Sequence, residues 1–361
     1  MNIAIIGAGP VGCYAGYLLA QEGHKVSIYE NHAEVGKPIQ CTGLLTKDLD
    51  EFNLDTNKFL VDTMHTIEVS SPHKKLSLHQ KEYLVCRTKF DQYLASLAEQ
   101  AGAAIHTQHS FQRKEGKELV IKNTKDNEEI RITPDLVIGA DGPLSPTAKA
   151  YGFYHKDRKN YVGIQATVKG NFKQGTISTF FSNDVCPGLF AWVVAEDAHT
   201  ARIGLGTLKD SRKHFDRFMQ KYDYTAVEMQ AGTIPVYHPK QQLQKDNCYL
   251  LGDAAGYVKA TTLGGIIPGM KQAQVLARCI KTGDDFQKAC KPIAKRLKTH
   301  LFIRNILDKF SDNDFDHLVE YVGQDKIKKI LLVHTRENPL PIILKGAIKE
   351  PRFARFVKHL F

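Results

Sequence analysis

The first thirty residues, MNIAIIGAGPVGCYAGYLLAQEGHKVSIYE, carry the pattern that most restricts how this chain folds. The apolar run 3–6 predicts a buried strand, GAGPVG predicts a tight turn into a helix, and a second strand then ends at Glu30. In such a unit Gly7 permits the turn, Gly9 lets a pyrophosphate approach the backbone, and Gly12 lets helix and strand pack closely. The segment therefore predicts a dinucleotide-binding βαβ unit.

The acid at the end of the second strand narrows the choice of nucleotide. Glu30 lies where a carboxylate accepts hydrogen bonds from both ribose hydroxyls. A negative charge at this position disfavours a 2′-phosphate. We therefore expect FAD or NAD rather than NADP.

Three later segments help to decide between those two. RTKFDQYLASLAEQAG places Arg87 just before an amphipathic helix, where it either reaches the phosphates of a dinucleotide or remains a solvated charge. DLVIGADGPLSPTAK is a buried strand that ends at Asp141 and Gly142, and CYLLGDAAG places Asp253 after a further strand. Asp253 is positioned to hydrogen-bond a polyol chain. FAD carries a ribityl chain and NAD does not, so the motifs favour FAD.

The composition and the cysteine spacing exclude several classes of protein. A chain of 361 residues, 42% of them hydrophobic, buries a substantial core in one large domain or two interleaved ones. Its seven cysteines form no CxxC pair and its start is not signal-like, so we expect no disulfide framework, no metal site and a cytoplasmic location. No apolar run approaches the roughly 18 residues that span a bilayer, so any membrane contact is expected to be peripheral.

The positive charge is concentrated at the end of the chain. The formal net charge is +10, and from Lys271 onward nineteen Lys and Arg face ten Asp and Glu. In the final EPRFARFVKHLF, helical spacing aligns Phe353, Phe356, Val357 and Leu360, with basic residues beside them. This apolar face either docks on the protein's own core or lies as an interfacial helix on an anionic membrane surface.

The middle of the chain, about 161–235, predicts a second kind of structure. GIQATVKG, GTISTFF, LFAWVVA and TARIGLGTL are short runs with strand-like alternation. Such alternation is typical of an antiparallel sheet that lines a cavity.

The four nucleotide motifs, in this order and spacing, resemble the FAD-dependent fold of the para-hydroxybenzoate hydroxylase class. VGKPIQCTGLL and GDAAGYVKATTLGGIIPGMKQA resemble, more specifically, the geranylgeranyl reductases, including the archaeal digeranylgeranylglycerophospholipid reductases. The similarity covers about residues 1–277. It implies an α/β (α+β) fold with a split FAD-binding Rossmann-type domain (1–70, 85–155 and 240–280), an antiparallel-sheet substrate domain (71–84 and 156–239) and a helical C-terminal region (281–361).

The resemblance also implies which residues contact the flavin. Carried over position by position, the FAD contacts are Val11, Glu30, Cys41, Thr42, Leu44, Arg87, Asp253, Gly265 and Ile266. Asp253 would hold the ribityl hydroxyls. The backbone at Gly264 to Ile266 would lie against the pyrimidine edge of the isoalloxazine, at a helix start whose dipole favours the anionic reduced flavin. Glycine is expected there because a Cβ would hit the ring; the alternative is a simple turn into a helix.

Three further residues are candidates for the reaction itself. CPGLFAWVVAED resembles the substrate-side motif YxWxFP of this family, with Phe190 for the tyrosine and Trp192 kept, but Val194 and Ala195 depart from it. Trp192 either lines an apolar tunnel or is a core aromatic. Cys41 lies in the family motif near the expected flavin face, where its thiol donates a proton, positions the flavin or simply packs.

The implied activity is the reduction of isolated double bonds in isoprenoid chains by FAD, in a pocket with little water. The expected substrate is a prenylated lipid or a prenyl diphosphate. The sequence has no second GxGxxG for NAD(P)H, but members of this fold can use a nicotinamide without one, so the expected electron donor is NAD(P)H or a small ferredoxin-like carrier. No nucleic-acid partner is expected.

Three alternatives remain open from the sequence. One is an aromatic monooxygenase or halogenase of the same fold. Another is a flavin-dependent enzyme without net redox turnover, such as a cyclase. The third is a basic lipid- or nucleic-acid-binding protein with a vestigial flavin site, which predicts colourless protein and salt-sensitive anion binding.

Overall fold

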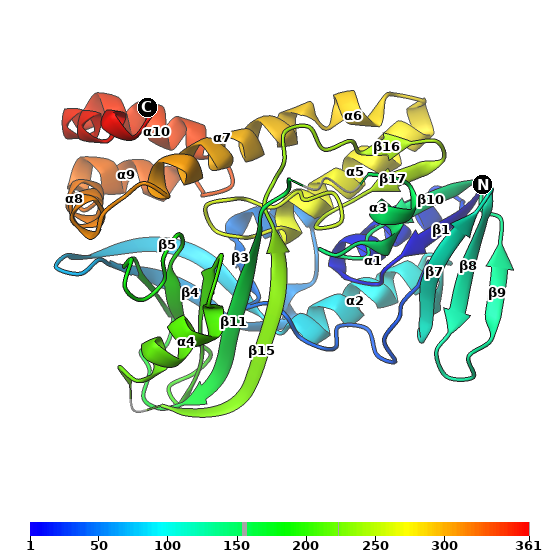
Figure 1. Cartoon of the computed structure of the whole chain (residues 1–361), viewed down its shortest axis with the longest axis horizontal. Helices are drawn as coiled ribbons and strands as arrows, with labels where there is room; N and C mark the ends of the chain where they lie inside the picture. Colours follow the sequence, from blue (N-terminus) through cyan, green and yellow to red (C-terminus); the bar gives the residue numbers. More distant parts are fainter. Residues whose placement is uncertain (154–156, 223, 361) are drawn as a thin grey trace. The chain divides into compact units, whose positions relative to one another are not determined.

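The computed structural model describes residues 1–153, 157–222 and 224–360, which form two compact units (Figure 1). Each unit is assembled from three separate stretches of the chain. The first unit contains 1–39, 87–159 and 234–298, and the second contains 40–86, 160–233 and 299–361.

These boundaries differ from the expected ones in two places. Residues 40–70, expected in the FAD-binding domain, belong to the second unit, because the two strands they contribute, β3 (Leu44–Thr46) and β4 (Leu60–Ser70), pair with strands of that unit. The helical C-terminal region, expected to begin at residue 281, is divided between the units within helix α7 (Lys291–Leu307).

The first unit is built on a six-stranded sheet with the order β16-β17-β10-β1-β2-β6. Its strands are β1 (Asn2–Ile6), β2 (Lys25–Tyr29), β6 (Ala104–His106), β10 (Leu136–Gly139), β16 (Gln244–Lys245) and β17 (Cys248–Leu250). All neighbours pair in parallel except β16 and β17. The interior strands are continuous apolar runs, as a parallel sheet covered on both faces requires, and Ile5, Ile28 and Ile138 are fully buried.

Helices and a small sheet complete the first unit. The helices are α1 (Pro10–Gln21), α2 (Arg87–Gln100), α3 (Pro146–Ala150), α5 (Ile266–Thr282), α6 (Phe286–Ala289) and the first part of α7. Helix α1 packs against both α2 and α5. The expected apolar face of α2 is confirmed, with Phe90 and Leu94 fully buried. A three-stranded antiparallel sheet consists of β7 (His109–Glu115), β8 (Glu118–Asn123) and β9 (Glu129–Ile132).

The second unit contains an eight-stranded sheet with the order β15-β11-β14-β13-β12-β4-β5-β3. Besides β4, its strands are β3 (Leu44–Thr46), β5 (Lys75–Val85), β11 (Asn160–Lys169), β12 (Thr176–Phe180), β13 (Ala191–Ala195), β14 (Thr200–Thr207) and β15 (Thr225–Pro235). The expected antiparallel sheet is confirmed for β11, β14, β13 and β12. Strand β12 pairs in parallel with β4, so three strands from residues 44–85 extend this sheet.

Short helical elements lie between the strands of this sheet in the chain. They are η1 (Lys47–Phe52), η2 (Thr56–Lys58) and α4 (Ser211–Met219). Phe215 and Phe218 of α4 are buried in a cluster with Ile203 and Leu205 of β14.

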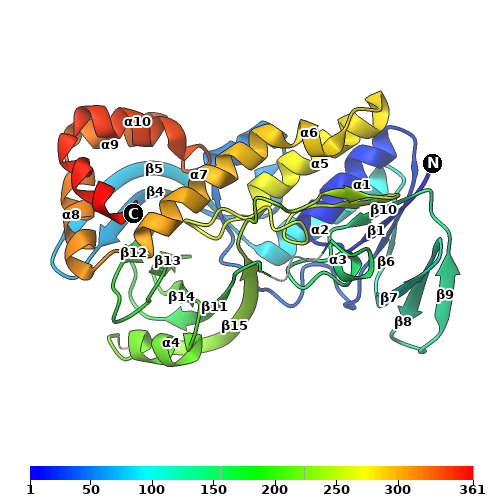
Figure 2. The ribbon, with the colours of Figure 1, turned by 45° about the horizontal axis from the view of Figure 1, so that its top comes forward.

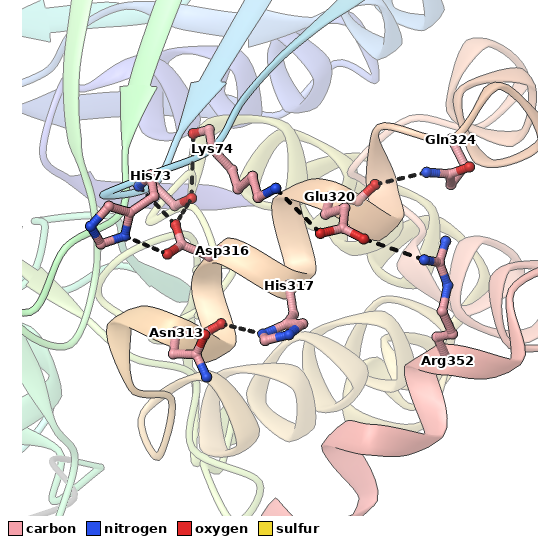
Figure 3. A network of polar contacts seen from close by, with 9 residues as sticks. His73, Lys74, Asn313, Asp316, His317, Glu320, Gln324 and Arg352 are labelled. Carbon is pink, nitrogen blue, oxygen red and sulfur yellow. Dashed lines mark hydrogen bonds and ion pairs between the residues drawn. The ribbon is translucent and has the colours of Figure 1, made fainter.

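The end of the chain continues from α7 through α8 (Asp312–Val322), α9 (Asp325–Val333), α10 (Pro339–Lys349) and the 3₁₀ helix η3 (Pro351–His359) (Figure 2). Polar contacts tie α8 to the tip of the β4–β5 hairpin (Figure 3). Asp316 accepts hydrogen bonds from Ser71 Oγ at 2.6 Å and from the backbone N–H of His73 at 2.9 Å. His73 Nδ1 lies 2.8 Å from the other oxygen of Asp316. These contacts attach helix α8 to the tip of the hairpin.

Phe353 and Phe356 of the C-terminal segment pack on the protein itself. Phe356 is buried with Phe310, Phe315 and Tyr321, and Phe353 packs against the same cluster. The first of the two alternatives for the C-terminal segment is therefore correct for these two phenylalanines. No helix in the described ranges is long and apolar enough to cross a bilayer.

Candidate functional site

The motifs found in the sequence lie at one edge of the parallel sheet. Gly7 directly follows β1 and Glu30 directly follows β2. Asp141 lies two residues after the end of β10, and Asp253 lies three residues after the end of β17. Because these four strands are parallel and adjacent, their carboxyl ends meet at the same edge. Ligands of open α/β sheets bind at this edge.

The glycine loop has the geometry that a phosphate-binding turn needs. Gly7 has φ +102°, and a Cβ there would lie 2.5 Å from the carbonyl oxygen of Ala140. A Cβ at Gly12 would collide with the carbonyl oxygen of Gly7, so α1 approaches the loop closely. A Cβ at Gly9, by contrast, has no atom within 4 Å. The backbone at the N-terminus of α1 is thus open to a phosphate, and this free space fits a dinucleotide.

Glu30 binds the glycine loop as well as lying at the expected ribose position. One carboxylate oxygen accepts a hydrogen bond from the N–H of Ala8 at 2.9 Å. The other accepts from the N–H of His32 at 3.0 Å and lies 2.6 Å from His32 Nδ1. His32 was not identified from the sequence. Only its position two residues after Glu30 could have indicated this contact.

Arg87 is not a solvated charge. It forms a two-pronged ion pair with Asp91, with Nε to Oδ1 at 3.1 Å and Nη2 to Oδ2 at 2.8 Å. Burial raises the pKa of Asp91, and the charge and hydrogen bonds of Arg87 oppose this rise. Asp91 was missed from the sequence, although an acid four residues after a basic residue on a helix is a signal for such a pair.

Asp253 lies in the electrostatic field of two arginines. Burial raises the pKa of Asp253, whereas the positive charges of Arg87 and Arg158 act in the opposite direction. Arg158 is itself buried and donates to the carbonyl oxygens of Ala254 at 3.3 Å and Pro143 at 3.0 Å. Sequence reasoning did not identify Arg158, which lies outside the four motifs.

The structure gives a further reason for the paired glycines. A Cβ at Gly265 would collide with Oδ1 of Asp253, and one at Gly264 would lie 3.0 Å from Cε of Lys259. The protein's own packing therefore disfavours a side chain at Gly265, and the expected contact of this backbone with the flavin ring stays a prediction. The expected helix start is confirmed, because α5 begins at Ile266 with Gly265 as its N-cap.

Val11 of α1 packs against the GDAAG turn and against α5. A Cβ at Gly252 would lie 3.1 Å from Val11 Cγ2, and one at Gly269 would lie 2.6 Å from it. The two glycines thus allow the glycine loop, the GDAAG turn and α5 to pack together at the sheet edge.

The carboxylate of Asp141 organises the protein's own turn. It accepts hydrogen bonds from Ser145 Oγ at 2.5 Å and from the N–H of Thr147 at 2.8 Å, at the start of α3. Asp141 thus supports the start of α3, whose N-cap is Ser145, and its expected contact with a nucleotide stays a prediction.

The family motif around Cys41 is anchored to the sheet of the second unit. Thr42 Oγ1 donates to Gln165 Oε1 at 2.7 Å, and the Arg202 guanidinium donates to the carbonyl oxygens of Thr42 and, at 3.1 Å, Val85. The N–H of Gly43 donates to Cys41 Sγ at 3.3 Å. The thiol is free and partly exposed.

The two aromatic candidates contact each other in the same unit. Phe190 and Trp192 are edge-to-face with centroids 6.0 Å apart. Trp192 is paired with Gly204 on β14, where a Cβ would lie 2.6 Å from the indole. Trp192 Nε1 is buried without a hydrogen-bond partner in the described structure. Trp192 and Leu44 pack against one cluster, formed by Met64, Leu84, Ile177 and Val194.

No group of His, Cys, Asp and Glu side chains in the described residues is arranged to hold a metal ion.

Comparison with known families decides the identity of the nucleotide. The FAD-binding domain family matches residues 1–184, which is half of the chain. The chain belongs to this family. FAD is therefore the cofactor, as the sequence predicted.

Relatives along the full length agree with the expected resemblance to geranylgeranyl reductases. A digeranylgeranylglycerophospholipid reductase of Methanocaldococcus jannaschii is 29% identical over 357 residues, with 90% of each chain covered. A reductase of the same name from Methanothermobacter thermautotrophicus is 26% identical, with 97% of each chain covered.

Solved structures show the same fold. A geranylgeranyl bacteriochlorophyll reductase-like protein of Thermoplasma acidophilum has a TM-score of 0.85 at 23% identity, covering 100% of this chain and 99% of that one. The flavin-dependent halogenase CmlS has a TM-score of 0.71 at 15% identity, covering 97% of this chain and 78% of that one. At these identities the likeness concerns the fold alone.

Proposed function

We propose that this protein is an FAD-dependent reductase that saturates C=C bonds in the isoprenoid chains of membrane lipids or their precursors. The observation that carries the proposal is the convergence of Gly7, Glu30 and Asp253 at one sheet edge, in a chain whose full-length relatives are named digeranylgeranylglycerophospholipid reductases. Geranylgeranyl chains are the proposed substrate class. The halogenase and monooxygenase alternatives have support from the fold only.

The first unit has a separate group for each part of FAD. The N-terminus of α1 binds the pyrophosphate next to Gly9, Glu30 binds the ribose, and Asp253 binds the ribityl chain. The N-terminus of α5, at Gly265 and Ile266, directs its positive dipole at the flavin. When bound and reduced, FAD supplies the hydride for the double bond.

The second unit provides the proposed groups for the substrate. Phe190 and Trp192 offer an apolar surface to a prenyl chain. Cys41, on the segment that Arg202 holds, acts at the flavin side of the reaction. Its thiol positions the reacting groups or donates the proton that the second carbon needs.

Replacing Cys41 with Ser separates these roles from simple packing. We expect lower double-bond reduction with FAD still fully bound, because serine keeps the size of the side chain and changes its acidity. A turnover equal to that of the wild type would return Cys41 to a packing role. Visible absorbance of the flavin in the same samples is the control for FAD content.

The electron donor and the location complete the proposal. We propose that electrons arrive from NAD(P)H or from a ferredoxin-like carrier, and that the reductase acts as a peripheral protein on a cytoplasmic membrane surface. Anaerobic reduction of the bound flavin by each donor distinguishes the two donors.

The decisive test of the activity is mass spectrometry of lipids from a host that supplies unsaturated prenyl ether lipids, with and without this protein. A gain of one hydrogen pair per reduced bond supports the proposal. Unchanged lipid masses, in cells that contain FAD-loaded protein, would contradict it.

A further inference from the structure

Exposed apolar side chains are concentrated in the last sixty residues. Sixteen large hydrophobic side chains are exposed in the described structure, and half of them follow residue 301. These eight are Phe302, Leu332, Val333, Leu340, Leu344, Ile348, Val357 and Leu360.

Helix α10 presents the clearest apolar stripe. Leu340, Leu344 and Ile348 are four residues apart and therefore lie on one face of the helix. They are 36%, 57% and 78% exposed, so the exposed fraction increases along the helix. In Figure 1, α9 lies between α10 and strand β5, and α9 packs against both, so α10 is an outer layer of its unit. Its opposite side carries the buried Pro339 and Gly346.

The end of α9, the neighbouring helix, carries two further exposed apolar residues. Leu332 and Val333, in its last turn, are 55% and 67% exposed. Five residues, 334–338, join α9 to α10, and Lys345 Nζ lies 2.9 Å from His334 Nε2 in this connection. We call Leu332, Val333, Leu340, Leu344 and Ile348 the apolar face of α9 and α10.

Positive charge surrounds the apolar face. Residues 325–360 contain nine Lys and Arg and three Asp and Glu, a net charge of +6. Two of the three acids, Glu337 and Glu350, are buried, which leaves Asp325 as the exposed acid of this segment. Lys345 and Lys349 directly follow Leu344 and Ile348 on α10.

Several of these basic side chains have no acidic partner. Lys326 and Arg352 pair with Glu350, and Lys358 pairs with Asp314. In the described parts of the chain, no ion pair engages Lys328, Lys329, Lys349 or Arg355. These four charges are free to meet an anionic surface.

We propose that the apolar face of α9 and α10, with its surrounding lysines, is the docking surface of this protein for anionic phospholipid membranes. The apolar side chains enter the boundary between headgroups and acyl chains, and the lysines extend their ammonium groups to the headgroups. A second copy of the chain is the less suitable occupant, because two faces with this excess of positive charge repel each other.

The inference rests on the proposed function in one respect, that prenyl lipids are taken from a membrane. The proposed docking surface differs from the one that the sequence offered as an alternative, the apolar face of the final segment. Phe353 and Phe356, once candidates for lipid contact, hold η3 on the aromatic cluster, and the exposed stripe lies on the preceding helix. Two weak signals, burial of a few apolar side chains and attraction of nearby lysines, together give reversible binding.

The test uses FAD-loaded, full-length protein and co-sedimentation with vesicles of phosphatidylglycerol and phosphatidylcholine, or of phosphatidylcholine alone. We expect binding to the anionic vesicles that weakens at high salt. The double variants Leu344→Gln with Ile348→Gln, and Lys345→Glu with Lys349→Glu, should each bind roughly tenfold or more weakly. The matched control is Val227→Gln with Met229→Gln, two exposed apolar residues of β15, which should bind as the wild type does.

The outcomes are separable. Equal vesicle binding by the wild type and both α10 variants would overturn the proposal. A wild type that binds no vesicles, and forms a dimer in light scattering that the Leu344→Gln and Ile348→Gln variant lacks, would show instead an interface between copies. Turnover of a detergent-solubilised prenyl lipid should be the same in the wild type and the α10 variants. Its absence from all of them would contradict the proposed activity and leave the vesicle result standing.

Discussion

Single side chains at the carboxyl edge of the parallel sheet have separate structural and binding roles. Gly7 and Gly265 are required by the protein itself, because their Cβ atoms would meet Ala140 and Asp253. Gly9 has open space around it, so only a bound group can require its bare backbone. Substitutions at these positions therefore separate folding from cofactor binding.

Gly9→Ala should lower FAD affinity while the FAD-free protein keeps its melting temperature. Gly9 has φ −70°, which alanine adopts without strain, and the new methyl group would take space next to the N-terminus of α1. Gly7→Ala, at φ +102°, should destabilise even the FAD-free protein by about 1–3 kcal/mol. Thermal melts with FAD titrations check both. Similar melting losses in the two variants would contradict this division.

Asp253→Ala should weaken FAD binding more than any other single carboxylate change in the first unit. The carboxylate lies in the field of Arg87 and Arg158 and is the expected partner of the ribityl hydroxyls. Loss of charge-assisted hydrogen bonds costs about 1.5–3 kcal/mol each, or roughly tenfold to a hundredfold in affinity. Fluorescence titration of FAD measures it. Asp141→Ala, which removes the acceptor of Ser145 and Thr147 at the start of α3, is the comparison, and full FAD occupancy in Asp253→Ala would reject the assignment.

At the scale of elements, buried carboxylates hold the C-terminal helices in place. Burial by itself raises the pKa of Asp316, but the hydrogen bonds from Ser71 and His73 outweigh it and lower the pKa. In the same way, burial raises the pKa of Asp314, and its contacts with Ser311 and Lys358 bring it down to about 2. Helix α8 is therefore attached by groups that must stay ionised.

Low pH should weaken the attachment of helix α8, because this attachment depends on ionised carboxylates. A carboxylate whose pKa is lowered by folding stabilises the fold above its unfolded pKa, and this stability is lost as the pH falls through the folded value. For Asp314 that window runs from the ordinary 3.8 down to about 2. Hydrogen exchange of α8 at decreasing pH should show faster opening in this range. Protection of α8 that does not change across it would contradict the prediction.

Asp316→Ala should destabilise the protein by about 1–3 kcal/mol at neutral pH, because it removes three contacts to the hairpin tip, one from Ser71 and two from His73. The matched control is Asp325→Ala on α9, an exposed aspartate whose loss should change stability by about 0.5 kcal/mol or less. Urea unfolding measures both. Equal effects of the two substitutions would show that the α8 contacts contribute little.

At the scale of the whole molecule, the chain passes repeatedly between its two units, since each contains three separate stretches. When one unit unfolds, it therefore no longer holds the ends of the stretches that form the other unit. We expect one cooperative transition, with the fluorescence of Trp192, the single tryptophan and a residue of the second unit, coinciding with loss of far-ultraviolet circular dichroism.

FAD should shift that transition as a whole. A ligand that binds only the folded state adds about 2.7 kcal/mol at a hundred times its Kd. Although the phosphate loop, Glu30 and Asp253 all belong to the first unit, Trp192 should report the same shift. A Trp192 transition that does not depend on FAD, next to one that does, would show that the units unfold independently.

The sequence alone determined those features that depend on local pattern. GAGPVG between an apolar strand and a helix determined the nucleotide unit, because only glycine permits that turn and approach. Alternation in 161–235 determined an antiparallel sheet, and the motifs favoured FAD, which the match to the FAD-binding domain family then showed. These signals lie within short windows of chain, so they need no knowledge of distant contacts.

Only the tertiary structure decided what depends on distant partners. It placed residues 40–70 in the second unit through the pairing of β4 with β12, directed the carboxylate of Asp141 to the start of α3, and placed Asp253 in the electrostatic field of Arg87 and Arg158. It also buried Phe356 and left Leu344 and Ile348 exposed. Periodicity shows that a helix has an apolar face, but which face is covered depends on elements that the local sequence does not contain.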